Sequence, residues 1–425
     1  MNHASKSACG ATRNRCSAEL GFFGSALPHE LVRDFGTPLY VYNESVLRER
    51  CRELKGLSED PGFRVCYSTK ANGNPHLLRI IREEGLIADA MSPGELALLK
   101  RAGFRKEEIC YVCNNVDAAE LALANAQADH VSVDSVSQVE SFGRVNPGGR
   151  VMARVNPGIG AGHSSKVITA GKKTKFGIPP EDFGALRAAL DAYGLKLIGL
   201  NQHVGSLFMD PKPYLDAARW LLKTAASFPG LEIIDFGGGF GVPYRKYDME
   251  KRLDLAEFGL RFGALISAFR AKQGFSGIFI IEPGRYIAAE CSILLGTVTA
   301  VKNNGGVRYV GTDLGFNVLA RPMIYDSFHD LEVYPGNDKP RALTLQTVVG
   351  NICETGDVLA RDRQIPELVE GDIVGVLDAG AYGQAMSSNY NQRLRPAEAL
   401  IRPDGSCSLI RRRDTIEDLL AVYPE

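Results

Sequence analysis

The stretch Phe63-Arg64-Val65-Cys66-Tyr67 is a short apolar run, and a helix-like segment beginning near Pro75 follows it. Runs of β-branched and aromatic residues that alternate with helical segments are typical of strand–helix units. The same alternation recurs along the chain as far as about residue 290. We therefore interpret this stretch as the first of a series of strand–helix units.

Eight strands are predicted in this part of the chain. They cover Phe63–Tyr67, Leu86–Ala90, Ile109–Val112, His130–Val133, Arg150–Val155, Leu197–His203, Leu231–Phe236 and Gly277–Ile281. Helical stretches between them include Pro75–Glu84, Gly94–Ala102, Ala118–Ala128, Pro180–Tyr193, Pro211–Phe228 and Leu253–Gln273. Eight units predict a (β/α)8 TIM barrel, an α/β fold, whereas the alternative, a doubly wound open sheet, would not need eight units to close.

The sequence changes in character after Glu290, where strand-like runs separated by turns replace the alternation. These runs cover Leu294–Val301, Val307–Gly311, Ala342–Val349, Asp372–Asp378 and Cys407–Arg411. They predict a second, β-rich domain, a sandwich or a barrel. The predicted organisation is an N-terminal extension and lead-in over residues 1–35, the barrel over residues 36–290 and the β-rich domain over residues 291–425.

The length of 425 residues suits two domains rather than one. A net charge of -1 gives no electrostatic reason to expect nucleic acid or an anionic membrane as a partner. No apolar run approaches the roughly 18 residues that a membrane-spanning helix needs. The first 20 residues lack the apolar centre of a signal peptide, and we expect them to form a frayed extension.

The chain has nine scattered cysteines, which favours reduced thiols and a cytoplasmic location. Cys110 and Cys113 form a CxxC pair, but no second pair accompanies them. The run around them has the apolar character of a buried strand. We therefore predict no metal site and no redox site there.

Lys70 stands directly after the first predicted strand, beside small and amide residues. Barrel enzymes carry their chemistry at the C-terminal ends of the strands, and a lysine in that place can form an imine. The glycines Gly237-Gly238-Gly239 follow the seventh strand, where backbone N–H groups without a Cβ nearby can approach a phosphate closely. An amine and a phosphate cradle together suggest pyridoxal 5′-phosphate as the cofactor.

Two further residues suit this cofactor. Glu282 follows the eighth strand, and a carboxylate against the pyridine nitrogen keeps that nitrogen protonated. His203 ends the sixth strand and could stack on the face of the ring.

Several stretches closely resemble fold-type III pyridoxal-phosphate decarboxylases, and among these the diaminopimelate decarboxylase family. The resemblance extends from about Gly36 to the C-terminus, and it is specific because the motifs occur together. They are Tyr67–Asn72, Arg154–Gly158, Thr174–Ile178, Gly237–Gly239, Glu282–Arg285, Cys353–Asp357, Ala379–Gly383, Met386–Asn391 and Leu409–Arg413. The family's fold is an alanine-racemase-like barrel with a β-rich domain, which agrees with the strand count. The resemblance implies decarboxylation of meso-2,6-diaminopimelate to L-lysine and CO2, the last step of lysine biosynthesis.

The resemblance also implies roles for single residues. Lys70 matches the Schiff-base lysine, His203 the histidine over the ring, and Glu282 the partner of the pyridine nitrogen. Cys353 matches the cysteine that returns a proton. The other residues that match cofactor ligands are Gly238, Gly239, Gly284, Arg285 and Tyr382, and those that match substrate ligands are Arg285, Arg321, Tyr325, Glu354 and Tyr382.

The substrate ligands make chemical sense for diaminopimelate. Arginines bind a carboxylate and a glutamate binds an ammonium, so Arg321 and Glu354 can together bind the distal amino-acid head group, which ornithine lacks. In this family the barrel and β-rich residues meet across a homodimer interface, and the resemblance implies shared active sites here. The segment 160–175, rich in Gly, Ser and Lys, is predicted to be a mobile lid.

The match has small departures and leaves alternatives. Asn201 stands where relatives often have a second histidine, the stretch Met91-Ser92-Pro93-Gly94 varies a Ser-x-Gly-Glu pattern, and Thr355 replaces a usual serine. A decarboxylase for ornithine or arginine would share the cofactor residues but should lack the pairing of Arg321 with Glu354. A racemase of the same fold would need a second acid/base, and a non-enzymatic regulator would be expected to lose Lys70 or Cys353.

Overall fold

A computed structural model of the chain describes residues 15–158, 174–337 and 339–424. The described residues fall into two units, each of which is considered by itself. One unit is made of Ser45–Pro243 and Lys251–Glu290, and the other of Met1–Glu44, Tyr244–Glu250 and Cys291–Glu425. The predicted lid segment lies outside the described residues, apart from its last two positions.

Eight parallel strands close into a barrel in the first unit. They are β2 (Phe63–Ser68), β3 (Ile87–Ala90), β4 (Ile109–Val112), β5 (His130–Val133), β6 (Arg150–Arg154), β7 (Lys196–Asn201), β8 (Ile233–Asp235) and β9 (Ile278–Ile281). Each strand pairs with the next in the chain, and β9 pairs with β2 to close the ring. The predicted eight-stranded barrel is therefore confirmed.

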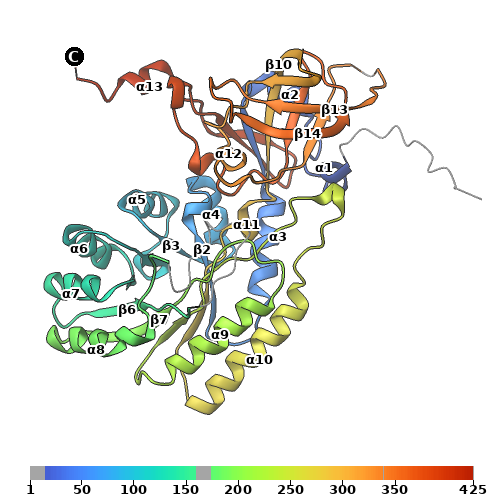
Figure 1. The fold of residues 1–425 in the computed structure, drawn as a ribbon. Helices are drawn as coiled ribbons and strands as arrows, with labels where there is room; N and C mark the ends of the chain where they lie inside the picture. Colours follow the sequence, from blue (N-terminus) through green and yellow to red (C-terminus); the bar gives the residue numbers. More distant parts are fainter. Residues whose placement is uncertain (1–14, 159–173, 338, 425) are drawn as a thin grey trace, which may run out of the picture. The chain divides into compact units, whose positions relative to one another are not determined.

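The barrel helices lie around the outside of these strands (Figure 1). They are α3 (Glu44–Lys55), α4 (Pro75–Glu83), α5 (Pro93–Ala102), α6 (Ala118–Gln127), α7 (Val136–Val145), α8 (Phe183–Ala192), α9 (Lys212–Ala225), α10 (Leu255–Gln273) and α11 (Arg285–Ala288). Short polar residues start several of them: the side chains of Asn74, Ser92, Asp117 and Ser135 each accept a backbone N–H of the first turn. Such caps satisfy donors that have no partner inside the helix.

Sulfur-containing and aliphatic side chains of the barrel strands form one buried cluster. Cys66, Cys110, Met152 and Ile233 come from β2, β4, β6 and β8, and they belong to one buried cluster. Ile198 of β7 and Ile280 of β9 belong to the same cluster, so at least six strands contribute to it. The predicted strand around Cys110 is thus confirmed as a buried part of the barrel.

The second unit contains a mixed sheet of nine strands. Its strands are β1 (Leu39–Asn43), β10 (Ser292–Asn304), β11 (Val307–Thr312), β12 (Leu331–Tyr334), β13 (Leu343–Val349), β14 (Val358–Pro366), β15 (Ile373–Val376), β16 (Ala397–Ile401) and β17 (Cys407–Arg411). The main path runs in the order β14-β13-β11-β10-β1-β16-β17, and β15 pairs with both β10 and β12. The predicted β-rich second domain is confirmed.

The helices of this unit are short. They are α1 (Arg15–Glu19), α2 (Pro28–Phe35), α12 (Arg321–Tyr325) and α13 (Ile416–Leu420). The core packs Phe22 and Leu31, before the sheet, against Val41 of β1, Ile293 of β10 and Ile373 of β15. Side chains from both ends of the chain therefore share one core.

The structure corrects two boundaries. Residues 36–44 were assigned to the barrel, but β1 pairs with β10 and β16 and so belongs to the β-rich unit. Of the first 20 residues, which were expected to fray, the structure describes residues 15–20, and there the Ser17 N–H donates to Glu332 Oε1 at 3.0 Å and Ser17 is buried. The secondary-structure propensity of the first residues could not reveal the pairing of β1 or the burial of Ser17, because both depend on partners about 250 residues or more away in the chain.

The described cysteines are all free thiols, as the sequence predicts. Within the described ranges, no helix combines the length and the apolar character needed to cross a membrane.

Candidate active site

The turn after β2 presents Lys70 at the C-terminal end of the barrel. A 3₁₀ turn at Thr69–Ala71 directly follows the strand. The buried Asp89, at the end of β3, accepts the Ser68 hydroxyl at 2.8 Å and the Thr69 N–H at 3.1 Å. Asp89 thereby fixes the backbone on which Lys70 stands. The Lys70 Nζ lies 3.5 Å from the Met91 sulfur and is partly exposed.

The glycine loop after β8 lies tightly against the ends of two neighbouring strands. A Cβ on Gly237 would lie 2.2 Å from the Gln202 carbonyl oxygen, and one on Gly238 would lie 2.0 Å from the Glu282 carbonyl oxygen. Gly237 and Gly239 also have φ values of +71° and +110°, which L residues rarely adopt. Only glycines let this loop approach both strands, so its backbone N–H groups are held at the rim of the barrel.

His203 lies beside this loop as a neutral imidazole. The Gly238 N–H donates to His203 Nδ1 at 3.2 Å, so the proton of the neutral ring is on Nε2. Burial, with the positive charge of Lys70 next in importance, lowers the pKa of His203 well below its usual value. An uncharged, oriented ring is suited to stack on a flat heteroaromatic cofactor.

Glu282 follows β9 and is buried, 4% exposed. Burial, and then the neighbouring Asp235, raise the pKa of its carboxyl well above the usual range. Its Oε1 atom has no hydrogen-bond partner among the described residues. A buried acceptor without a donor is costly, and the N–H of a pyridinium ring would satisfy it. The chain's own residues therefore fit pyridoxal phosphate at this end of the barrel.

Gly284 and Arg285 continue from Glu282 into α11. A Cβ on Gly284 would lie 3.0 Å from Cβ of both Ser68 and Ala71, so this glycine allows α11 to pack on the turn that carries Lys70. Arg285 is 6% exposed and donates to Ser206 Oγ at 3.0 Å. Lys70, His203, the glycine loop, Glu282 and Arg285 are thus gathered at one rim, as the sequence predicts for strand ends.

The β-rich unit holds the other expected residues, and Arg321 is the most firmly fixed of them. Arg321 begins α12, is 2% exposed and donates to His329 Nε2 at 2.8 Å. His329 Nδ1 lies 2.8 Å from the Leu377 carbonyl, which can only accept, so the proton is on Nδ1 and Nε2 is free to accept from Arg321. The guanidinium also lies over the Tyr244 ring, 4.5 Å from its centroid.

Cys353 and Glu354 lie on an exposed loop between β13 and β14. The buried Asp357 fixes the loop by accepting the N–H groups of Ile352 at 2.7 Å and Phe316 at 2.6 Å. The Cys353 thiol lies 3.5 Å from Asn391 Oδ1, and Glu354 Oε1 accepts the Tyr390 hydroxyl at 2.7 Å. The loop is therefore ordered although its tip faces solvent.

Tyr382 and Tyr325 are the remaining expected residues, and both are partly exposed. Tyr382 has a φ of +56°, a conformation that a bulky residue adopts at a cost of order 1–3 kcal/mol. Backbone strain of this kind is concentrated at functional sites, which is consistent with the role expected of Tyr382.

Sequence reasoning gave no role to several residues that support the site. Asp89 and Asp235 end strands of the barrel, and His329, Tyr244 and Tyr390 hold the expected substrate ligands. A signal existed only for the two aspartates, since each is an acidic residue in an otherwise apolar strand.

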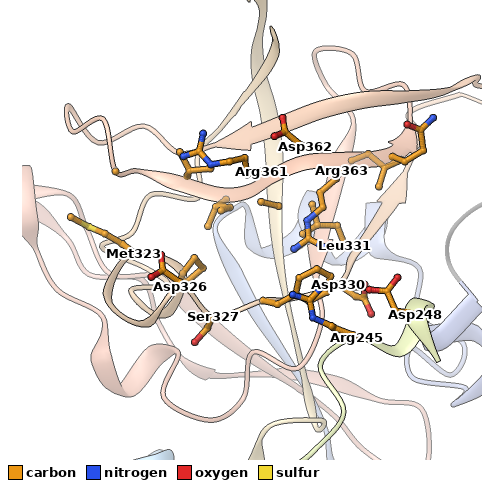
Figure 2. A pocket seen from close by; sticks show the side chains of 18 residues that line it. Arg245, Asp248, Met323, Asp326, Ser327, Asp330, Leu331, Arg361, Asp362 and Arg363 are labelled. Carbon is orange, nitrogen blue, oxygen red and sulfur yellow. Dashed lines mark hydrogen bonds and ion pairs between the residues drawn. The ribbon is translucent and has the colours of Figure 1, made fainter. Parts of the chain in front are cut away.

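A pocket of about 650 Å³ also lies in the β-rich unit, between α12 and β14 (Figure 2). Arginine and aspartate side chains dominate its lining, among them Arg245, Asp326 and Arg363. None of the residues expected at the active site lines it. We therefore treat the pocket as separate from the candidate site.

Comparison with known proteins defines the class. Residues 45–289 match the family model described as the pyridoxal binding domain of pyridoxal-dependent decarboxylases. The class is thus that of barrel-type, pyridoxal-dependent decarboxylases, and the cofactor is pyridoxal phosphate.

Full-length relatives identify the family more narrowly. The diaminopimelate decarboxylase of Methanothermobacter thermautotrophicus is 40% identical over 408 residues, which cover 93% of this chain and 94% of that protein. The Escherichia coli K12 enzyme of the same name is 34% identical, with 92% and 95% covered. A diaminopimelate decarboxylase crystal structure superposes with a TM-score of 0.86 at 33% identity, covering 92% and 95%. The chain belongs to the diaminopimelate decarboxylase family.

The position of the cofactor gives a first prediction. After borohydride reduction of the purified protein and peptide mapping, the pyridoxyl group should be found on Lys70, the lysine at the barrel rim. The Lys70→Ala variant should carry no covalently fixed cofactor, whereas Lys100→Ala, on the exposed face of α5, should be labelled like the wild type. A pyridoxyl group on any other lysine would show that the assignment is wrong.

Proposed function

We propose that this chain decarboxylates meso-2,6-diaminopimelate to L-lysine and CO2, the last step of lysine biosynthesis, with pyridoxal 5′-phosphate as its cofactor. Family membership supports the reaction. The observation that carries the choice of substrate is the buried Arg321. Its guanidinium, oriented by His329, is a fixed site for a carboxylate. A decarboxylase for ornithine would have no use for it, because the distal end of ornithine has no carboxylate.

The barrel residues bind and orient the cofactor in this proposal. Lys70 would be the amine that holds it, Gly238 and Gly239 would belong to the loop that binds its phosphate, and Glu282 would be the partner of its ring nitrogen. When bound, pyridoxal phosphate supplies an electron sink for the charge that remains when CO2 leaves. His203 would stack on the ring, and Gly284 and Arg285 complete the rim near Lys70.

The β-rich residues bind the substrate and return a proton. Arg321 and Tyr325 bind the distal carboxylate and Glu354 binds the distal ammonium, while Tyr382 contacts both cofactor and substrate. The thiol of Cys353 donates the proton that replaces CO2 on the α-carbon. A thiol placed beside the reacting carbon can act as a general acid. The exposed setting of Cys353 leaves its Sγ open to a reacting partner.

We also propose that the active form is a cytoplasmic homodimer with shared sites. Cys353 and Glu354 lie on an ordered loop whose tip is exposed in the single chain. A general acid and a charged substrate ligand act best away from bulk water, and a second copy of the chain could cover them. Free thiols throughout the described chain are consistent with a reducing compartment.

Assays of the purified protein on related substrates test the function. A site with a fixed cation and a fixed anion should reject substrates that leave either unpaired. We expect kcat/KM for meso-diaminopimelate to exceed that for ornithine by about 10⁴, the scale of such discrimination. Release of CO2 and lysine would be measured beside arginine and L,L-diaminopimelate. Comparable kcat/KM values for ornithine and meso-diaminopimelate would contradict the proposal.

The role of Cys353 gives a further prediction. Cys353→Ala should keep the visible spectrum of the bound cofactor but lose ~10²–10⁴-fold in kcat, the usual contribution of a general acid. Cys407→Ala is the matched control, because Cys407 is also a free thiol of the β-rich unit, but it is half-buried and lies in β17. Near wild-type turnover by Cys353→Ala would mean that another group or water returns the proton.

Mixing of inactive subunits tests the shared sites. Suppose that Glu354 acts in the partner's site. A hybrid dimer of one Lys70→Ala subunit and one Glu354→Ala subunit then has one site that carries both substitutions and one site that carries neither. Such hybrids should recover up to about half of the activity per dimer. Hybrids whose formation is proven by native mass spectrometry, but which remain inactive, would show that each chain has a complete site of its own.

A further inference from the structure

The motif Met386–Asn391 is part of the resemblance, but the proposed mechanism gives it no role. Its last two residues lie in the turn Tyr390–Gln392 of the β-rich unit. Asn391 and Gln392 have φ values of +55° and +56°, which residues with a Cβ seldom adopt. Backbone strain of this kind persists where surrounding contacts fix it, and it is concentrated at functional sites. The turn is therefore a candidate for a role at the active site.

The turn contacts the loop that carries Cys353 and Glu354, and it does so at both of these side chains. The Tyr390 hydroxyl donates to Glu354 Oε1 at 2.7 Å. The Cys353 thiol donates to Asn391 Oδ1 at 3.5 Å. A thiol is a weak donor, so the second contact places the sulfur rather than adding much stability.

Other contacts join the turn to the same loop through backbone and ring atoms. Arg393 Nη2 donates to the Asn351 carbonyl at 2.8 Å. The Tyr390 ring packs against the ring of Phe316, with centroids 5.4 Å apart. The Phe316 N–H donates to Asp357, the carboxylate that fixes the loop. These contacts hold the turn in place independently of the Tyr390 hydroxyl.

The hydroxyl contact leaves Glu354 able to bind a substrate. A carboxylate has two oxygens, so the second one can accept from an ammonium while Oε1 accepts from Tyr390. The hydrogen bond to Glu354, and then the charge of that carboxylate, raise the pKa of Tyr390, so its hydroxyl keeps its proton and remains the donor. Tyr390 thereby restricts the rotamers of an exposed side chain before the substrate arrives.

The amide contact leaves the proton of Cys353 available. Rotation about the Cβ–Sγ bond turns the S–H away from Asn391 while the sulfur stays in place. In the proposed step this proton forms the new C–H bond at the α-carbon, and the electrons of the S–H bond remain on sulfur as a thiolate. Asn391 has a neutral amide, so it sets the place of the sulfur without acting as an acid or a base.

We propose that Tyr390 and Asn391 are positioning residues, which hold Glu354 and Cys353 at a fixed separation. The inference rests on the proposed function, which makes Glu354 a substrate ligand and Cys353 the proton donor. All of the contacts lie within one unit of one chain, so they persist whichever chain supplies the cofactor site. The two residues act on different steps: Tyr390 acts on binding of the distal ammonium, and Asn391 acts on proton return.

The kinetics of Tyr390→Phe test the first contact. This variant keeps the ring against Phe316 and loses only the hydroxyl. KM for meso-diaminopimelate should rise about 10-fold, because a hydrogen bond to a charged group is lost, while kcat stays within about twofold of the wild type. The inhibition constant of 2-aminopimelate, which has the distal carboxylate but no distal ammonium, should not change. An unchanged KM, or an equal rise in both constants, would overturn the role of Tyr390.

Two substitutions of Asn391 test the second contact. Asn391→Gly deletes the amide, whereas Asn391→Asp keeps an oxygen at the same place, and both new residues tolerate the left-handed backbone. In Asn391→Gly, kcat should fall about 10-fold with KM unchanged, and in Asn391→Asp it should stay within about threefold of the wild type. Wild-type kcat in Asn391→Gly, or equal losses in the two variants, would overturn the role of Asn391.

Asn389→Ala is the matched control. The Asn389 amide donates to the Arg393 carbonyl at 2.9 Å and to Asp414 Oδ2 at 3.3 Å, so it supports the same segment through other partners. Its kcat and KM should stay within about twofold of the wild type. A loss of kcat equal to that of Asn391→Gly would mean that any loosening of the segment has this effect, which would overturn the proposal.

A double variant separates this inference from the proposed function. If Asn391 acts through Cys353, adding Asn391→Gly to Cys353→Ala should cause no further loss of kcat. A further loss of about 10-fold would show that Asn391 acts on something else and would overturn the inference. Near wild-type kcat in Cys353→Ala would instead refute the proposed proton donor. A loss in Cys353→Ala together with wild-type kcat in Asn391→Gly would refute the positioning role alone.

Discussion

The pairing of β2 with β9 is the constraint on which the active site depends. Phe63 lies opposite Phe279 and Val65 opposite Ile281, which closes the ring of parallel strands. Beyond the last pair, the Ser68 N–H still donates to the Pro283 carbonyl at 3.2 Å. Ser68 Oγ also lies 3.2 Å from the Glu282 carbonyl, 214 positions away in the chain. Without this closure, Lys70 and Glu282 would stand at the two free edges of an open sheet.

Closure of the barrel brings buried charged groups, as well as the candidate catalytic residues, to the same rim. Asp89, Asp235 and Glu282 are carboxyl groups with almost no exposure, and Arg154 is nearly as buried. Burial of these groups opposes folding, and it is offset by backbone N–H donors and by Coulomb attraction. Glu282 Oε1 has no hydrogen-bond partner among the described residues, so the cost of burying this atom is not offset. A bound cofactor can offset this cost by donating a hydrogen bond to Glu282. Cofactor binding should therefore stabilise the folded barrel in addition to enabling catalysis.

The sequence predicts the barrel well because each strand is a short apolar run bounded by a helix cap or a glycine. It predicts the β-rich unit less well, and β14 explains why. Arg361, Asp362 and Arg363 interrupt the apolar pattern of that strand, and Asp362 takes a φ of +50° where the pairing with β13 shifts register. A bulge of this kind depends on the partner strand, and one strand's own pattern cannot reveal it. Strand β16 escaped prediction for a related reason, since it is buried along its whole length and shows no alternation.

The residues of the candidate site also differ in whether the sequence alone can predict them. Lys70, Glu282 and the glycine loop can be predicted because their residue types are unusual at strand ends. His329 and Tyr244 cannot be predicted, because each contacts Arg321, the proposed substrate ligand, and their proximity exists only in the folded unit.

The two charges of the β-rich unit that are proposed to bind the substrate differ in how firmly they are held. Arg321 is buried and its orientation is set by His329, whose own tautomer is set by a backbone carbonyl. Glu354 is exposed and is held by one hydroxyl, that of the exposed Tyr390. A fixed, desolvated cation needs little reorganisation to bind a carboxylate, whereas an exposed anion is screened by water and gains strength only when water is excluded. In the proposed homodimer, Arg321 would therefore be ready in each chain, and Glu354 would become an effective ammonium ligand only when a second chain covers it. Preference for a substrate that carries both a distal carboxylate and a distal ammonium would then depend on formation of the homodimer as well as on the residues present in each chain.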